Sequence, residues 1–226
     1  MRRTIRFYVL RNPEVEEGQE PQFAVTDFLK SDPVNRGSGL LCPLCHKPVG
    51  MLPWLPPYRA ELQFWGKEAG DIAFGPGDEL LVSERFIQLW RQAGLCGLGG
   101  FDKVEVVKTK NCGRKKRGLK PAGNYHVVKM ARSRAAIDDA ASGLIREGEG
   151  RACEECRARG IIKRARRVVL EEETWSGEDV FYARGLSGTI IVSERYRDFH
   201  IANRINNGLL IQANEYGFDS YPWEKG

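Results

Sequence analysis

Residues 41–45 of the chain read Leu-Cys-Pro-Leu-Cys, and residues 152–156 read Ala-Cys-Glu-Glu-Cys. Each of these Cys-x-x-Cys pairs is followed by a tryptophan and then, 17 residues after it, by the valine of a Val-Ser-Glu-Arg sequence, at residues 82–85 and 192–195. The distances from the cysteines to that valine agree to within one residue. Because the spacing of rare residues recurs, the sequence predicts one structural unit that is used twice.

The Val-Ser-Glu-Arg sequences predict the starts of two helices. Ser83 and Ser193 are suitable N-caps, and the glutamate that follows each serine favours the first turn of a helix. After Ser83, apolar residues at positions 86, 89 and 90 share one helical face, and Gly94 is a natural stop.

The order of these elements predicts an α+β protein of two tandem, pseudo-symmetric repeats. Each repeat combines antiparallel strands with a capped helix, and the cysteine pairs join the two. Residues 1–108 form the first repeat, with its helix starting at residue 83, and residues 121–226 form the second, with its helix starting at residue 193. Residues 109–120 form a basic linker, and we expect the whole to fold as one compact unit.

The composition is that of a globular chain with a mild basic excess. Apolar residues make up 42% and charged residues 29%, and the formal net charge is +5. The apolar stretch near the N-terminus is too short, and too interrupted by arginine, for a signal peptide. No segment reaches the length of a membrane span. We therefore expect a cytoplasmic protein that has no membrane partner.

The cysteine pairs point to a metal site. In a reducing compartment, Cys-x-x-Cys pairs are more typical of metal or redox sites than of disulfides. A closed structural zinc site takes four ligands, and one pair supplies two of them. If the two repeats pack about a pseudo-twofold axis, their pairs meet at that axis. We therefore predict that Cys42, Cys45, Cys153 and Cys156 bind a single structural zinc ion.

Two other interpretations of the pairs stay open. A redox-active pair sits at a helix N-terminus, which lowers the thiol pKa. No helix start is evident after Cys42, and the two glutamates after Cys153 disfavour a thiolate, so redox chemistry is the weaker interpretation. Alternatively, the pairs bind no metal and simply pack. Cys96, in a packed segment, and Cys112, in a loop, are expected to be ordinary reduced thiols, and His46 a polar neighbour of the first pair.

A run of seven basic residues lies between residues 108 and 120. Such a run can bind phosphate backbones. It has no interleaved aromatic residues for base stacking and belongs to no recognisable reading module, so a solvated linker is the favoured interpretation. The alternative is a zinc-stabilised nucleic-acid-binding protein that uses residues 114–117 and the arginine-rich strand at residues 164–167.

No catalytic constellation is evident in the sequence. It contains three histidines, none of which recurs at an equivalent position of the two repeats. We find no glycine-rich phosphate loop, nucleophile elbow or His-Glu metal motif. N-capping accounts for Ser83 and Ser193, and a structural capping role is the favoured interpretation of Asp71 and Asp179. The sequence therefore predicts a protein that is not an enzyme.

Taken together, two Cys-x-x-Cys pairs, each followed by an apolar-Ser-Glu-Arg-aromatic helix start, resemble the myxobacterial double-CxxCG motif family. The resemblance spans nearly the whole chain, and its specificity lies in the order and spacing of short motifs. Where the family motif has a glycine after each second cysteine, this chain has His46 and Arg157, and Gly50 and Gly160 follow a few residues later.

Members of that family are described as immunity proteins of Sit-type toxins, which are lipoproteins passed between cells by outer-membrane exchange. The resemblance implies a non-catalytic protein that binds and neutralises a cognate protein toxin. It implies a protein partner rather than nucleic acid, and it assigns no residue as a toxin contact.

Overall fold

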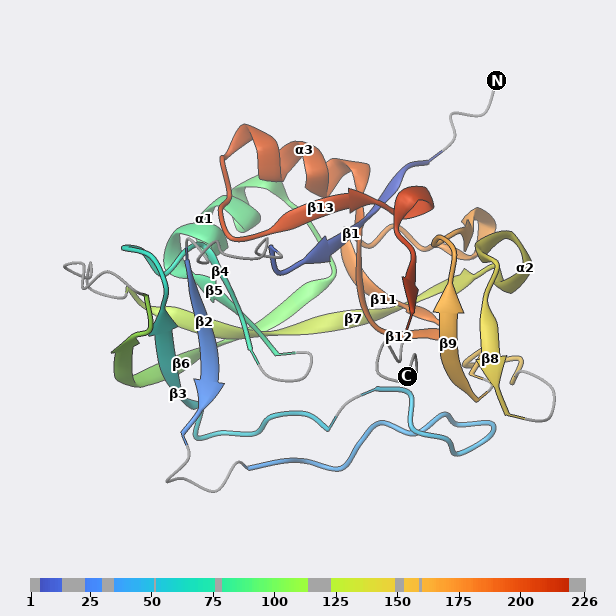
Figure 1. Cartoon of the computed structure of the whole chain (residues 1–226), viewed down its shortest axis with the longest axis horizontal. Coiled ribbons are helices and arrows are strands. Elements are labelled where there is room, and N and C mark those ends of the chain that lie inside the picture. The colour runs from blue at the N-terminus through green and yellow to red at the C-terminus, as the bar shows by residue number, and fades with distance from the viewer. Residues whose placement is uncertain are drawn as a thin grey trace.

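The computed structural model describes residues 5–13, 23–29, 35–50, 52–75, 79–113, 123–148, 153–158 and 160–219. Within these ranges the protein is mostly β, with three α-helices (Figure 1). An eleven-stranded mixed sheet curls into a half-barrel, and a three-stranded sheet lies beside it. None of the helices in the described ranges is long and apolar enough to cross a membrane.

The strands and helices have the following bounds. Along the large sheet the order is β13 (Leu209–Gln212), β1 (Phe7–Arg11), β12 (Leu186–Ser193), β11 (Val180–Arg184), β7 (Tyr125–Ile137), β6 (Leu98–Asn111), β3 (Arg59–Phe64) and β2 (Ala24–Phe28). Off this path, β4 (Ile72–Phe74) pairs with β5 (Leu80–Ser83), and both β5 and β10 (Leu170–Glu171) pair with β7. The small sheet has the order β14 (Phe218–Asp219), β9 (Ile161–Ala165) and β8 (Ile145–Glu147). The α-helices are α1 (Glu84–Ala93), α2 (Asp139–Ser142) and α3 (Glu194–Ala202), and short 3-10 helices span Glu172–Thr174 and Ala213–Glu215.

The large sheet is mixed, so the prediction of antiparallel strands is wrong for two strand pairs. β3 runs parallel to β6, and β7 runs parallel to β11. Parallel neighbours require a long crossover connection. The β4–β5 hairpin and α1 supply it between β3 and β6, while α2, the strands β8, β9 and β10 and a 3-10 helix supply it between β7 and β11.

The two long helices begin where the sequence predicts. The Ser83 hydroxyl accepts a hydrogen bond from the N–H of Phe86, and the Ser193 hydroxyl accepts one from the N–H of Tyr196, both at 3.1 Å. Gly94 ends α1 in the left-handed conformation, which glycine adopts without steric penalty. N-capping is therefore confirmed as the role of both serines.

The two helices pack against each other through aromatic rings and together cover one face of the curled sheet (Figure 1). The ring of Phe86 meets that of Phe199 edge-on, with centroids 5.8 Å apart. Trp90 contacts both Tyr196 and Phe199, each at 6.2 Å. These four side chains are buried, so they anchor both helices in the core below.

The opening strand of each half of the chain is paired with strands of the other half. β1 lies between β12 and β13, and β7 pairs with both β5 and β6. The registers correspond, because Phe7 faces Ser193 and Tyr125 faces Ser83. The strand before each long helix is thus held by a strand from far away in the sequence.

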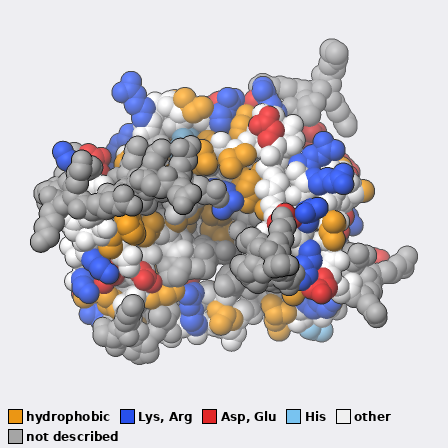
Figure 2. Space-filling view, in the orientation of Figure 1, with side chains coloured by type: hydrophobic (Ala, Val, Ile, Leu, Met, Phe, Trp, Pro, Cys, Tyr) orange, Lys and Arg blue, Asp and Glu red, His pale blue; other side chains and the backbone are white. Residues whose placement is uncertain are grey.

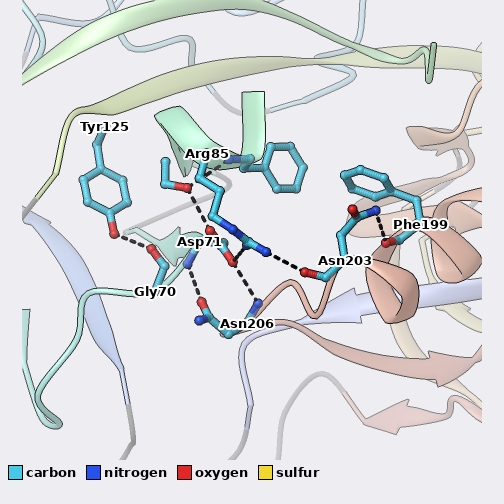
Figure 3. A network of polar contacts seen from close by, with 9 residues as sticks. Gly70, Asp71, Arg85, Tyr125, Phe199, Asn203 and Asn206 are labelled. Atoms are coloured by element: carbon cyan, nitrogen blue, oxygen red, sulfur yellow. Dashed lines mark hydrogen bonds and ion pairs between the residues drawn. The ribbon is translucent and has the colours of Figure 1, made fainter. Parts of the chain in front are cut away.

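A buried carboxylate organises the start of α1 (Figure 3). Asp71 accepts hydrogen bonds from the Ser83 hydroxyl at 3.0 Å and from Arg85 Nη1 at 2.6 Å. Arg85 Nη2 then donates to the carbonyl of Asn203, just beyond the end of α3, at 2.6 Å. The N–H of Asn206 also donates to the Asp71 carboxylate.

The same arrangement occurs at the start of α3. Asp179 accepts from the Ser193 hydroxyl at 2.7 Å, from Arg195 Nη1 at 3.2 Å and from the N–H of Cys96 at 2.9 Å. Arg195 Nη2 donates to the carbonyl of Gly94, just beyond the end of α1, at 2.7 Å. Carbonyls at a helix end have no partner within the helix and carry partial negative charge. The arginine in the first turn of each long helix therefore lies at the C-terminal end of the other helix, where it complements the partial negative charge.

Removing one buried carboxylate should destabilise the whole fold. Asp179→Ala removes the carboxylate that accepts hydrogen bonds from the Cys96 N–H, the Ser193 hydroxyl and Arg195 Nη1. We expect the free energy of unfolding, measured by urea denaturation, to fall by about 2–4 kcal/mol. The control is Asp198→Ala on α3, which removes an exposed carboxylate paired with Arg197 and should change stability by less than about 1 kcal/mol. Equal effects of the two substitutions would contradict this account of the helix starts.

Candidate metal centre

The two distant cysteine pairs lie together. The Sγ atoms of Cys42 and Cys153 are 3.7 Å apart, those of Cys45 and Cys156 are 3.6 Å apart, and all four lie within 4.8 Å of one another. In a tetrahedral site with Zn–S bonds of about 2.3 Å, neighbouring sulfurs are about 3.8 Å apart. The cluster can therefore hold a metal ion such as zinc, with all four ligands supplied by the chain.

Both pairs sit in the same kind of turn. In the first knuckle (residues 42–47), the N–H of His46 donates to the carbonyl of Cys42 at 2.9 Å. In the second knuckle (residues 153–158), the N–H of Arg157 donates to the carbonyl of Cys153 at 2.8 Å. His46 and Arg157 have φ of 56° and 58°, the left-handed conformation that glycine adopts most easily. The residues that replace the motif glycines thus keep the turn, at a conformational cost of roughly 1 kcal/mol each.

The first knuckle is carried at the tip of an extended arm, residues 35–55, of which residue 51 lies outside the described ranges. The arm is a narrow ribbon held by backbone hydrogen bonds such as those from Gly37 N to Pro53 O and from Val49 N to Leu40 O. Figure 1 shows it running along the lower edge of the molecule toward the small sheet. Most of its described residues are exposed or half-buried, so little apolar burial holds the tip in place.

At the base of the arm, Trp54 packs edge-on between Phe28 and Tyr58, with ring centroids 5.2 and 5.1 Å away. The proline-rich segment around Trp54 contains no helix or regular strand. This segment is therefore a loop whose buried Trp54 covers the core.

The second knuckle is anchored to the large sheet. Arg157 forms an ion pair with Glu171 at 3.0 Å. From β11, Arg184 Nη1 donates to the carbonyl of Glu155 at 3.1 Å, and its Nε donates to the carbonyl of Arg134 in β7 at 2.7 Å. The two knuckles thus differ: the second knuckle is bonded to the large sheet, whereas the first lies at the tip of the arm.

An arginine from the sheet contacts each of the two cysteine-bearing segments. Arg184 binds the second knuckle as described above, and Arg132 in the neighbouring parallel strand β7 donates to the carbonyl of Val49 in the arm. These two arginines thus tie both cysteine-bearing segments to adjacent strands of the large sheet. Sequence reasoning missed both residues, because nothing in the sequence separates them from other arginines on strands.

The thiols differ in acidity. Hydrogen bonding from the backbone N–H of Cys45 lowers the pKa of Cys42 to about 7, whereas burial raises the pKa of Cys156 to about 12. A divalent cation must displace the protons that remain, so its affinity falls as pH falls. The described residues that follow each pair, 46–50 and 157–158, form no helix. The helix N-terminus that typically activates a redox pair is therefore missing from both knuckles.

The predicted linker, the arginine-rich strand and Cys96 are not part of the cysteine cluster. Residues 109–111 of the predicted linker belong to β6, and residues 114–120 lie outside the described ranges. In the arginine-rich strand, Arg164 pairs with Asp219 at 2.6 Å. Cys96, which was predicted to be a reduced thiol in a packed segment, is free and exposed, and the buried side chain of that segment belongs to the preceding residue, Leu95.

Neither models of known protein families nor the curated proteins match this chain.

The left-handed residue of the first knuckle gives a direct test of the turn. His46→Gly relieves the backbone, whereas Lys47→Gly at the next exposed position, where φ is not positive, only adds flexibility to the unfolded chain. We expect His46→Gly to be more stable than Lys47→Gly by about 1–2 kcal/mol in urea unfolding of the zinc-loaded protein. If the two variants prove equally stable, the left-handed turn is not a source of strain.

Proposed function

We propose that the four cysteines bind one structural zinc ion. All four ligands are thiols at tetrahedral spacing, which is typical of a closed site that leaves no position for a substrate. The ion would fix the tip of the arm to the second knuckle, and thereby to the large sheet.

We also propose that the chain consists of two related repeats, residues 1–108 and 121–226, joined by the basic segment 109–120. Corresponding contacts support this: the registers of β1 with β12 and of β7 with β5, and the two Asp-Ser-Arg networks. In this arrangement the zinc site lies where equivalent knuckles of the two repeats meet.

On this basis we propose that the protein is a non-catalytic, cytoplasmic immunity protein that binds and neutralises a cognate Sit-type toxin. The observation that carries the proposal is the order and spacing of the paired Cys-x-x-Cys and Ser-Glu-Arg motifs. Both kinds of motif join distant parts of the chain. The four cysteines lie together, and the arginine of each Ser-Glu-Arg sequence links the two long helices. A rigid scaffold of this kind suits a protein that acts by stoichiometric binding.

Nucleic-acid binding remains the alternative function. The carboxylate of Asp219 forms an ion pair with Arg164, and this pairing offsets positive charge that the strand could otherwise offer to phosphate. Retention on heparin across a salt series distinguishes the two, because binding to a phosphate backbone weakens steeply with salt.

The zinc proposal predicts that chelation frees the arm while the core stays folded. Amide hydrogen exchange in the presence and absence of chelator should show faster exchange at residues 37–50, where the ribbon bonds lie. Exchange in α1 and α3 should stay slow, because their burial and Asp-Ser-Arg contacts need no metal. Uniform acceleration across the chain, or no change in the arm, would contradict the proposed role of the ion.

The immunity proposal predicts rescue of growth when the chain is co-expressed with the toxin encoded beside its gene, together with co-purification of the two proteins. Cys153→Ser/Cys156→Ser should lose rescue, since the arm then has no anchor. Cys96→Ser, which removes an exposed thiol outside the cluster, should rescue like the natural chain. If the natural chain fails to rescue growth and does not bind the toxin, the proposal falls.

A further inference from the structure

A groove of about 690 Å³ lies beside the metal centre. The arm forms one wall with Leu40, Leu41 and Val49, and the small sheet forms the other with Ile161 and Ile162 of β9. The floor is made by β7, β11 and β12 of the large sheet. Because one wall is the arm, the shape of the groove depends on the contact between the knuckles.

Apolar side chains reach solvent on both walls of the groove. Leu40 is 56% exposed and Leu41 is 51% exposed on the arm, and Ile161 is 53% exposed on β9. Figure 2 shows hydrophobic side chains at the surface along the lower edge of the molecule, where the arm runs. Exposed apolar side chains gathered on facing walls are typical of a surface that a partner covers.

Among the described residues that line the groove, the charged ones are Glu155 and four arginines. On the small sheet, Arg146 is held by the carboxylate of Asp139 at 2.9 Å. On the floor, Arg132 and Arg184 donate to carbonyls of the two cysteine-bearing segments. Arg134 is exposed, and its side chain forms no hydrogen bond or ion pair with any described residue. Among the described residues of the floor, Arg134 is therefore the cation that is left for a ligand.

We propose that this groove binds an extended peptide segment of a protein partner, with a carboxylate opposite Arg134 and apolar side chains against Leu41 and Ile161. The proposal rests on the proposed function, in which the chain binds a protein, and it places the partner on the face that the metal centre shapes. A guanidinium group pairs well with a carboxylate. Apolar walls beside the one free arginine of the described floor suit a peptide better than a nucleic acid, whose affinity comes from many phosphate contacts.

The first experiment measures how tightly the zinc-loaded chain binds the toxin encoded beside its gene. Arg134→Glu and Leu41→Asp should each weaken the complex by about tenfold or more, because each places a repulsive or polar group in the groove. The matched controls are Lys103→Glu, an exposed cation on β6, and Ile201→Asp, an apolar residue of α3 that is 61% exposed. Both controls should stay within about twofold of the natural chain.

The second experiment does not depend on the toxin. A displayed library of random peptides is selected against the zinc-loaded chain, and a fluorescent single-stranded DNA is titrated in parallel. We expect selected peptides with an acidic residue flanked by apolar residues, which lose binding in Arg134→Glu and Leu41→Asp but not in Lys103→Glu.

The outcomes separate the two proposals. Groove-dependent acidic peptides without any toxin binding would support the groove and overturn the immunity function. A toxin complex that Arg134→Glu and Leu41→Asp leave unchanged would place the partner elsewhere and overturn the groove. DNA binding that is lost in Arg134→Glu, without selected peptides, would make the groove a phosphate site and overturn the peptide proposal.

Discussion

The arm, residues 35–55, is held mainly by the contact between two cysteine pairs from opposite halves of the chain, because the hydrophobic core does not hold it. The arm is a ribbon of mostly exposed residues, and at its tip only Cys42 is buried. Hydrophobic burial therefore contributes little to its position. A metal ion held by four thiolates releases free energy on the order of 10 kcal/mol or more, which exceeds the entropy lost when such a long loop is closed.

The core uses a different means of joining the two halves, and that means involves no metal. Strands β1 and β7 are paired with strands of the opposite half, and Arg85 and Arg195 each reach from the start of one long helix to the end of the other. Asp71 and Asp179 hold both the capping serine and the arginine, so a single buried carboxylate fixes each helix start. The contacts of the core are therefore independent of the cysteine cluster, which lies beside the arm and the groove.

Much of this arrangement could be predicted from the sequence. The serine caps follow from local chemistry. The meeting of the cysteine pairs was predicted from the repeated spacing, because two repeats packed about an axis would bring equivalent pairs together. The parallel pairing of β3 with β6 and of β7 with β11 could not be predicted, since strand direction depends on how the crossovers pack. Arg132 and Arg184 were missed for a related reason: they bind backbone carbonyls whose positions only the tertiary fold determines.

The position of the arm depends most on the proposed bridging of both knuckles by one ion. Zinc content per chain, measured for the natural protein and for two variants that each replace both cysteines of one knuckle with serine, tests this directly. A shared ion predicts one equivalent in the natural protein and almost none in either variant, because two thiolates bind zinc far more weakly than four. A natural protein that carries no zinc, or a variant that keeps its full equivalent, would contradict the claim.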